Sequence, residues 1–230
     1  MRLPHGVPDT RTRILDAAVE RFGRDGFHAP LRTVAADAGV SAAAIIKHFG
    51  SKDELHRACD ERVLGIIGDY KREAMRSDDL GATFLAQMAV MDEFQGLIRY
   101  FVRSLLAGGD VARHLLEETR TRAREWMRDG VAAGNLRPSR DEELRVTFAL
   151  SVSVGWMVQA VLSSGKDLGE LDSQFWHRTF HSMMLPALEV YTEGLLTDRS
   201  MLDQYVSYLS DPQAAAAPAG DDGARATAGG

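Results

Sequence analysis

One stretch near the N-terminus combines basic, hydroxyl and small side chains in a way that suits contacts with nucleic acid. The candidate residues are Thr33, Ser41, Ala42, Ala43, Lys47, His48 and Lys52. A lysine can bind a guanine edge or a phosphate oxygen, and an alanine can pack against a thymine methyl. Lys47 is the strongest single candidate for a base contact, whereas Thr33 and Lys52 lie where phosphate oxygens would come. These residue types predict binding to double-stranded DNA.

Two of these candidates also have ordinary structural explanations. Lys47 could be a solvated charge, although its position directly after the apolar Ile46 favours a contact with DNA. His48 could equally stack inside the folded module. Whether each side chain contacts DNA or has only a structural role therefore depends on the helix that carries it.

The segment around Gly39 predicts two short helices joined by a tight turn. Gly39 can adopt the left-handed conformation that ends the first helix, and Thr33 has a hydroxyl that can cap or support it. After the turn, Ser41 can cap the second helix. Ile45 and Phe49 then return at i and i+4 to one inner face. Such a helix-turn-helix commonly places its second helix in the major groove of DNA.

Further helices are predicted on both sides of this motif. The first covers residues 11–24, with Asp9 or Thr10 as its cap. After the motif, Ser51 can cap a long helix over residues 52–76. That helix is long enough to join the DNA-binding module to the rest of the chain.

The N-terminal part of the chain resembles the TetR family of transcriptional regulators. The residues that carry the resemblance are Ile14, Ala17, Ala18, Phe22, Gly26, Phe27, Val34, Ala35, Ala38, Gly39, Val40, Ser41, His48, Phe49, Gly50, Ser51, Lys52 and Leu55. The family usually has aromatic residues at the positions of Ile46 and His48, and often a polar or basic residue at Ala42. This chain therefore departs from the family pattern at three positions of its recognition helix.

The resemblance implies an all-helical fold. A three-helix DNA-binding domain, residues 1–56, would be followed by a larger ligand-binding and dimerisation domain, residues 57–210, and a disordered tail, residues 211–230. It also implies a homodimer that binds a palindromic operator and is released by a small-molecule effector. In such proteins the last two long helices pair with their copies in a four-helix interface.

Composition and charge agree with a local DNA contact. The chain of 230 residues has a formal net charge of -6, yet residues 1–56 carry 8 Lys/Arg against 7 Asp/Glu, whereas residues 57–230 carry 19 against 26. The single cysteine, Cys59, excludes an intrachain disulfide framework. The N-terminus lacks the apolar core of a signal peptide, so we expect a cytoplasmic protein.

The middle of the chain predicts helices over residues 80–91, 94–106 and 110–133, with a break at Asp92 and Glu93. Asp110 is the expected cap of the third, and Val111 is expected on its inner face. Its arginines predict a solvated face. The candidate effector-binding residues are Phe84, Met88, Met91, Phe94, Trp126 and Phe148. Each could equally belong to an ordinary core. The effector is expected to be largely apolar, and neutral or cationic, because a buried anion would need a basic partner.

The C-terminal part predicts two apolar helices. Residues 146–165 carry no formal charge, but their serines and other polar residues favour a buried helix over a membrane span. The segment 171–185 is its expected partner. Pro186 should kink that helix or open a new segment, 187–196, and residues 201–209 predict one more short helix.

No catalytic or cofactor motif accompanies these features. His177 and His181 have the spacing of metal ligands on a helix, but no third ligand follows nearby, so neither a metal nor a cofactor is expected. The alternative to a regulator is a helical enzyme or small-molecule binding protein with a degenerate DNA-binding module. The sequence leaves open the effector, the target genes and whether binding represses or activates.

Overall fold

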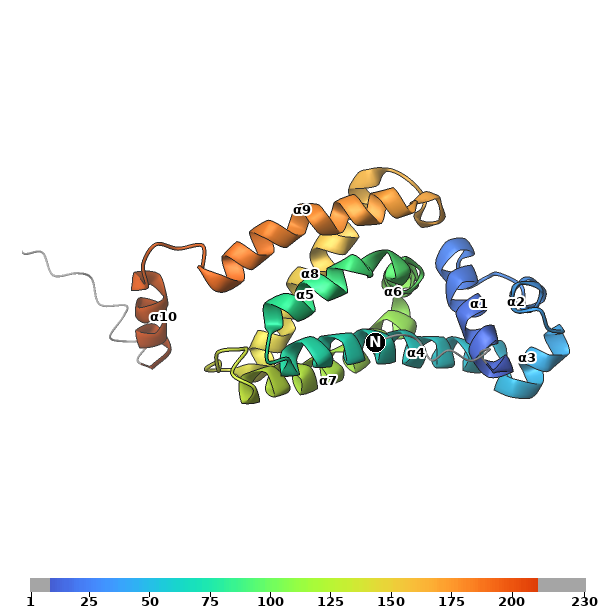
Figure 1. The fold of residues 1–230 in the computed structure, drawn as a ribbon, viewed down its shortest axis with the longest axis horizontal. Helices are drawn as coiled ribbons and strands as arrows, with labels where there is room; N and C mark the ends of the chain where they lie inside the picture. The colour runs from blue at the N-terminus through green and yellow to red at the C-terminus, as the bar shows by residue number, and fades with distance from the viewer. Residues whose placement is uncertain (1–8, 211–230) are drawn as a thin grey trace, which may run out of the picture. The chain divides into compact units, whose positions relative to one another are not determined.

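The computed structural model describes residues 9–210, and these contain helices and no strand. The predicted all-α fold class is therefore confirmed. The elements in chain order are α1 Thr10–Asp25, α2 Leu31–Ala38, α3 Ala42–Phe49, α4 Lys52–Arg76, α5 Leu80–Ala89, η1 Met91–Phe94, α6 Gln95–Ala107, α7 Gly109–Ala132, α8 Glu142–Ser164, η2 Leu168–Glu170, α9 Ser173–Thr192 and α10 Ser200–Ser210 (Figure 1). The chain divides into two units, Met1–His181 and Ser182–Gly230.

Local capping explains where the first helices begin and end. The Asp9 carboxylate accepts a hydrogen bond from the backbone N–H of Thr12 at 2.7 Å, as predicted for the start of α1. Gly39 has φ 66° and ψ 37°, which is the left-handed conformation expected at the corner. Ser41 caps α3 by accepting from Ala44 N–H at 3.1 Å. Thr33 supports α2 rather than capping it, because its hydroxyl donates to the Pro30 carbonyl at 2.7 Å.

A continuous hydrophobic core joins the helix-turn-helix to the helices behind it. Its buried members include Ile14 and Phe22 of α1, Val34 of α2, Ile45 of α3, Leu55, Cys59 and Val63 of α4, Tyr100 and Phe101 of α6, and Leu115 of α7. The predicted boundary between residues 56 and 57 falls inside α4, and this core continues on both sides of it. The division into domains 1–56 and 57–210 stays a prediction.

The long helices α4 and α7 run side by side (Figure 1). Arg72 and Arg76 of α4 form ion pairs with Asp129 of α7, at 3.9 and 2.9 Å. The Asn135 side chain donates to the carbonyls of Met75 and Ser77, at 3.0 and 2.9 Å. These bonds satisfy carbonyls at the C-terminal end of α4, which no residue of the helix itself can reach.

Several predicted helix features need correction. Asp110 does not cap α7, whose N-cap is Gly108; instead Asp110 pairs with Arg113 at 2.7 Å. Val111, expected on the inner face, is 44% exposed. Pro186 opens no new segment, because α9 continues past it to Thr192.

The predicted break at residues 92 and 93 is confirmed as the 3-10 turn η1, and the predicted short helix over residues 201–209 is confirmed as α10.

The apolar helix α8 lies largely on the surface of the described chain. Only 11% of its most apolar window is buried, so the expectation of a buried helix is wrong for the single chain. By length and composition alone α8 could cross a membrane, and it is the one helix of the described residues that meets this test. The expected disordered tail, residues 211–230, lies outside the described residues.

The first helix approaches α6 closely at Gly23. A Cβ atom at this position would lie 3.0 Å from the backbone nitrogen of Tyr100 and 3.3 Å from its Cα. Both atoms belong to a buried backbone that cannot move aside alone, because Tyr100 is itself fully buried. The absence of a side chain at Gly23 therefore sets the distance between α1 and α6.

We predict that Gly23→Ala destabilises the protein relative to Gly65→Ala. Both substitutions improve helix propensity by roughly 1 kcal/mol. A Cβ at Gly65 would meet nothing within 4 Å, whereas the one at Gly23 forces overpacking that costs about 1 to 3 kcal/mol. Urea denaturation followed by circular dichroism measures the difference. Equal stabilities of the two variants would contradict the tight contact.

Candidate nucleic-acid interface

The outer face of α3 carries the side chains that can reach a DNA groove. Ala43, Lys47 and His48 are exposed there, together with Ile46, which is 44% exposed. Ala42 is partly buried against the core, and the Ser41 hydroxyl is occupied as the cap of the helix. The structure therefore brings Ala43, Lys47 and His48 onto one accessible surface.

The inner face of α3 fixes its orientation. Ile45 is fully buried and Phe49 nearly so, and both belong to the core that α1 and α4 complete. The ring centroid of His48 lies 6.4 Å from that of Phe49, and the imidazole is exposed. His48 thus lies on the surface of the module rather than stacked inside it.

Two exposed arginines on the neighbouring helices α1 and α2 were not predicted from the sequence. The Arg11 guanidinium lies 5.0 Å from the centroid of the Phe49 ring, which places a positive charge at the end of α3. Arg32 is exposed in the first turn of α2. Lys52 is partly buried, with its Nζ 5.9 Å from the Phe22 ring. The position of Arg11 could not be found from sequence, because its contact crosses from α1 to α3.

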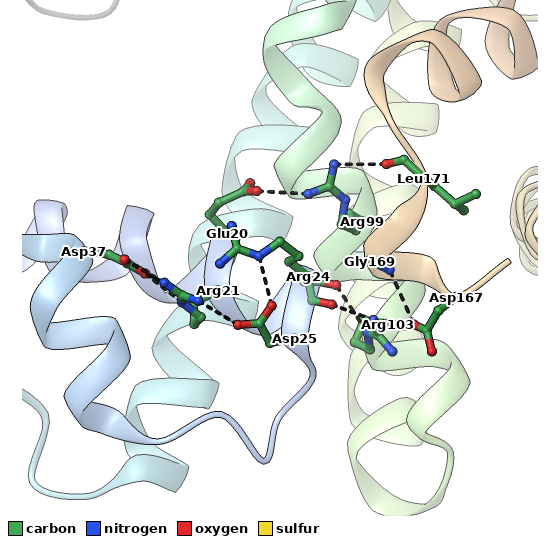
Figure 2. Close-up of polar contacts among 11 residues, drawn as sticks. Glu20, Arg21, Arg24, Asp25, Asp37, Arg99, Arg103, Asp167, Gly169 and Leu171 are labelled. Atoms are coloured by element: carbon green, nitrogen blue, oxygen red, sulfur yellow. Dashed lines mark hydrogen bonds and ion pairs between the residues drawn. The ribbon is translucent and has the colours of Figure 1, made fainter.

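Arg21 holds α2 against α1 (Figure 2). Its Nε and one terminal nitrogen each donate to Asp37 at 2.7 Å, and the other terminal nitrogen donates to Asp25 at 2.7 Å. Hydrogen bonds from Arg24 and Arg21 lower the pKa of Asp25 to about 2, and the bond from Arg21 also lowers the pKa of Asp37. A bidentate guanidinium contact has a defined geometry, so it fixes the angle of α2 as well as its distance.

Two arginines of α6 hold the C-terminal half of α1 (Figure 2). Arg103 donates to the carbonyls of Gly23 and Arg24, at 3.2 and 2.9 Å, and contacts Asp167 at 3.4 Å. Arg99 donates to Glu20 at 2.9 Å and to the Leu171 carbonyl at 3.3 Å. A guanidinium at the last carbonyls of a helix satisfies them and complements the negative end of its dipole.

The segment around η2 takes part in the same junction. A Cβ at Gly169 would lie 2.6 Å from the Arg24 carbonyl oxygen, so η2 lies directly against the end of α1. Asp167 links η2 to Arg103. The C-terminal end of α1 therefore contacts both α6 and the turn between α8 and α9.

A buried hydrogen bond joins α6 to α4. The Tyr100 hydroxyl donates to the Asp60 carboxylate at 2.8 Å and approaches the His56 carbonyl at 3.3 Å. The His56 ring packs edge-on against Phe22, at 4.3 Å between centroids, and against Phe27 at 4.8 Å. Burial, reinforced by the charge of Lys52, lowers the pKa of His56 to about 4. The imidazole is therefore neutral near pH 7.

The six candidate effector-binding residues lie in different surroundings. Phe84, Met88, Met91 and Phe94 are partly buried, and the ring of Phe94 packs edge-on against Tyr70 at 4.3 Å. Trp126 lies beside the small core around Met127 and Val146. Phe148 is 64% exposed on α8. Their role in effector binding stays a prediction.

The histidine pair of α9 forms no larger ligand set. The rings of His177 and His181 lie 4.2 Å apart. Within residues 9–210, no group of three or more His, Cys, Asp or Glu side chains could hold a metal ion.

Comparisons with known proteins agree with the helix-turn-helix geometry. Residues 14–59 match the family model "Bacterial regulatory proteins, tetR family", and residues 92–197 match "Tetracyclin repressor-like, C-terminal domain". The chain is 42% identical over 201 residues to the HTH-type transcriptional regulatory protein RaaS of Mycobacterium tuberculosis, covering 87% of this chain and 92% of that protein. The chain belongs to the TetR family of transcriptional regulators.

A further similar sequence and a solved structure with a similar fold were also found. The HTH-type nicotine-responsive transcriptional repressor HdnoR of Paenarthrobacter nicotinovorans is 36% identical over 101 residues, 40% of this chain and 52% of that protein. The structure of SmeT, the repressor of the Stenotrophomonas maltophilia multidrug efflux pump SmeDEF, has a TM-score of 0.53 at 22% identity. The matched region covers 80% of this chain and 92% of the SmeT chain. The family model that matches residues 14–59 thus spans most of α1 and all of α2 and α3.

We predict that acid destabilises this module through His56. The folded state holds the pKa of His56 at about 4 and the unfolded chain at its ordinary value of 6.5. Between pH 6.5 and pH 4 the unfolded state binds more protons than the folded state. The contribution of His56 to the free energy of unfolding is therefore fully present above pH 6.5 and is lost as the pH falls toward 4. The loss should be on the order of 1 kcal/mol, allowing for the partial exposure of the ring.

A His56→Phe variant isolates this effect from the carboxylates, which titrate in the same range. Urea denaturation at several pH values should show wild type losing stability relative to the variant between pH 6.5 and 4. Parallel pH profiles for the two proteins would exclude a role for His56.

Proposed function

We propose that this TetR-family regulator is a homodimeric repressor that binds a palindromic operator and is released by a small-molecule effector. The observation that carries the proposal is the exposed row of Ala43, Lys47 and His48 on a helix whose inner face is locked by Ile45 and Phe49. A rigid helix with outward basic and small side chains suits the major groove. The similar protein HdnoR is a nicotine-responsive transcriptional repressor, which supports repression over activation.

Base and phosphate contacts are divided between different helices in this proposal. Lys47 reads a base edge, and Ala43 packs against a thymine methyl. Arg11, Thr33 and Lys52 lie on the helices other than α3 and contact phosphates, which fixes the register of α3 on DNA. Ile46 cannot donate a hydrogen bond, so its contribution to recognition is apolar contact.

The exposed apolar surface of α8 supports dimer formation. Leu144, Phe148, Val152 and Leu162 are exposed large hydrophobic residues of this one helix. Monomeric proteins rarely leave such a surface in water, and a symmetric dimer would cover it. A two-fold axis also places two copies of α3 for successive major grooves, about 34 to 36 Å apart.

Regulation rather than catalysis is the function that these features support. The polar groups assembled around α1 and α6 are ion pairs and carbonyl contacts that hold helices together, not a nucleophile beside a base. Binding to chromosomal DNA requires the protein to reside in the cytoplasm.

We predict that Lys47→Ala weakens binding to the operator by about 1 to 3 kcal/mol and relaxes specificity at one position per half-site. Lys52→Ala should instead weaken binding to all DNA sequences alike. It should also reduce the slope of log affinity against log salt concentration by about 1 per phosphate contact. Fluorescence anisotropy with DNA from the protein's own upstream region, at several salt concentrations, measures both. Lys166→Ala removes the same charge at an exposed position outside the module and serves as the control. Wild-type affinity and salt slope in both Lys47→Ala and Lys52→Ala would contradict this docking surface.

We predict a solution mass of twice 25.3 kDa by light scattering coupled to gel filtration. Phe148→Glu should shift the protein toward the monomer, since a carboxylate in an apolar interface loses its hydration. Val111→Glu changes another exposed apolar residue, on α7, and should leave the dimer intact. A wild-type protein that is monomeric at micromolar concentration would refute the dimer and the palindromic operator with it.

A further inference from the structure

Two arginines of α6 each join α1 to the turn between α8 and α9, residues 167–171 (Figure 2). Arg99 and Arg103 lie four residues apart, about one helical turn, so both face the same side of α6. Arg99 donates to the Glu20 carboxylate of α1 at 2.9 Å and to the Leu171 carbonyl of the turn at 3.3 Å. The guanidinium of Arg99 therefore bridges two segments that are far apart in the sequence.

Arg103 forms a second bridge of the same kind. Its guanidinium donates to the carbonyls of Gly23 and Arg24, at 3.2 and 2.9 Å, and to the Asp167 carboxylate at 3.4 Å. Carbonyls in the last turn of a helix have no intrahelical donor. Arg103 therefore supplies hydrogen bonds that α1 cannot supply itself, and the same side chain holds the turn.

The turn that these arginines reach is anchored in the protein. It shares one apolar cluster with α6, α8 and α9, whose buried members are Val102, Val161, Leu168, Leu171 and Trp176. The Asp167 side chain accepts from the Gly169 N–H, and the Glu170 side chain accepts from the Asp167 N–H, which forms a capping box. The turn is thus held to the adjoining ends of α8 and α9 by both packing and hydrogen bonds.

The turn also contacts α1 directly at Gly169. A Cβ atom at this position would lie 2.6 Å from the carbonyl oxygen of Arg24 and 3.5 Å from its carbonyl carbon. The same oxygen accepts the hydrogen bond from Arg103. The backbone of the turn and the Arg103 side chain therefore meet at one carbonyl of α1.

We propose that this turn, through Arg99 and Arg103, fixes the DNA-binding module relative to α8 and α9, and that Arg103 is a positioning residue for operator recognition. The exposed apolar face of α8 is the surface proposed above to meet a second copy. In such a dimer the angle between α1 and α8 sets the separation of the two recognition helices. Two guanidinium bridges and one backbone contact hold that angle, so the dimer accepts one spacing of half-sites. The effect on spacing rests on the proposed function, whereas the bridges belong to the single chain.

Pulsed electron paramagnetic resonance on the DNA-free protein tests the positioning. Spin labels on Ala36→Cys in α2 and Arg128→Cys in α7 occupy exposed positions, and the native Cys59 is buried. Labelled chain in an excess of unlabelled chain reports the distance within one protomer. Arg103→Met keeps a long side chain but removes the donors, so it should broaden this distance distribution. Arg113→Met, at an exposed ion pair of α7, is the matched control and should leave the distribution unchanged.

A second variant tests the direct contact without removing a charge. Gly169→Ala pushes the turn away from the Arg24 carbonyl, so it should also broaden the distribution. It decides the test by itself if Arg103→Met does not fold. Gly65→Ala adds a methyl group that meets nothing within 4 Å and serves as its control. Wild-type distributions in both Arg103→Met and Gly169→Ala would overturn the positioning role.

Operator duplexes from the protein's own upstream region, with one base pair inserted or removed between the half-sites, test the effect on recognition. Wild type should prefer one spacing. The ratio of affinities for the best and the altered spacing should fall about tenfold in Arg103→Met, because the module is no longer held in one geometry.

Two other outcomes separate this inference from the proposed function. If Arg103→Met binds every duplex more weakly by the same factor, Arg103 has only a structural role, and its role in spacing is overturned. Broadened distances in the variants together with no operator binding by wild type would refute the proposed function and leave the positioning of the module in place.

Discussion

The contact between α1 and α6 is the constraint on which the rest of the DNA-binding half depends. Gly23 lets two backbones approach, and Arg103 donates to the carbonyls of Gly23 and Arg24 at the same contact. Helix α1 in turn holds α2 through Arg21 and Asp37, and its apolar face completes the core under α3. Helix α3 is therefore connected to α6 through a series of bonded and packed groups.

This arrangement explains how an acidic chain can bind DNA. The positive side chains of the proposed interface are few, and their positions matter more than their number: Lys47 is exposed on α3, and Arg11 lies over the Phe49 ring. Many other arginines are used internally as ion-pair partners, as Arg21, Arg72 and Arg99 show. Net charge therefore says little about where a chain can meet a phosphate backbone.

The sequence was informative wherever a residue acts on its own neighbours. Gly39 must form the corner because its left-handed backbone suits few other residues, and Ser41 and Ser51 start helices because their hydroxyls reach N–H groups three residues ahead. The bounds of α4 followed from the same local signals. The apolar character of α8 was also evident from the sequence, but its exposure was not. The same pattern is typical of a buried core helix and of a helix whose apolar face is exposed in the single chain.

By itself, then, the sequence determined the helix-turn-helix, its caps and the outward position of Lys47, since each depends on spacings of three or four residues within one helix. The tertiary structure alone decided which residues meet across the fold. The Arg103 contact with the end of α1 and the bond between Asp60 and Tyr100 join residues 40 to 80 positions apart. No local periodicity records such a pairing, because it arises only when the packing of α1, α4, α6 and α7 fixes the distances between them.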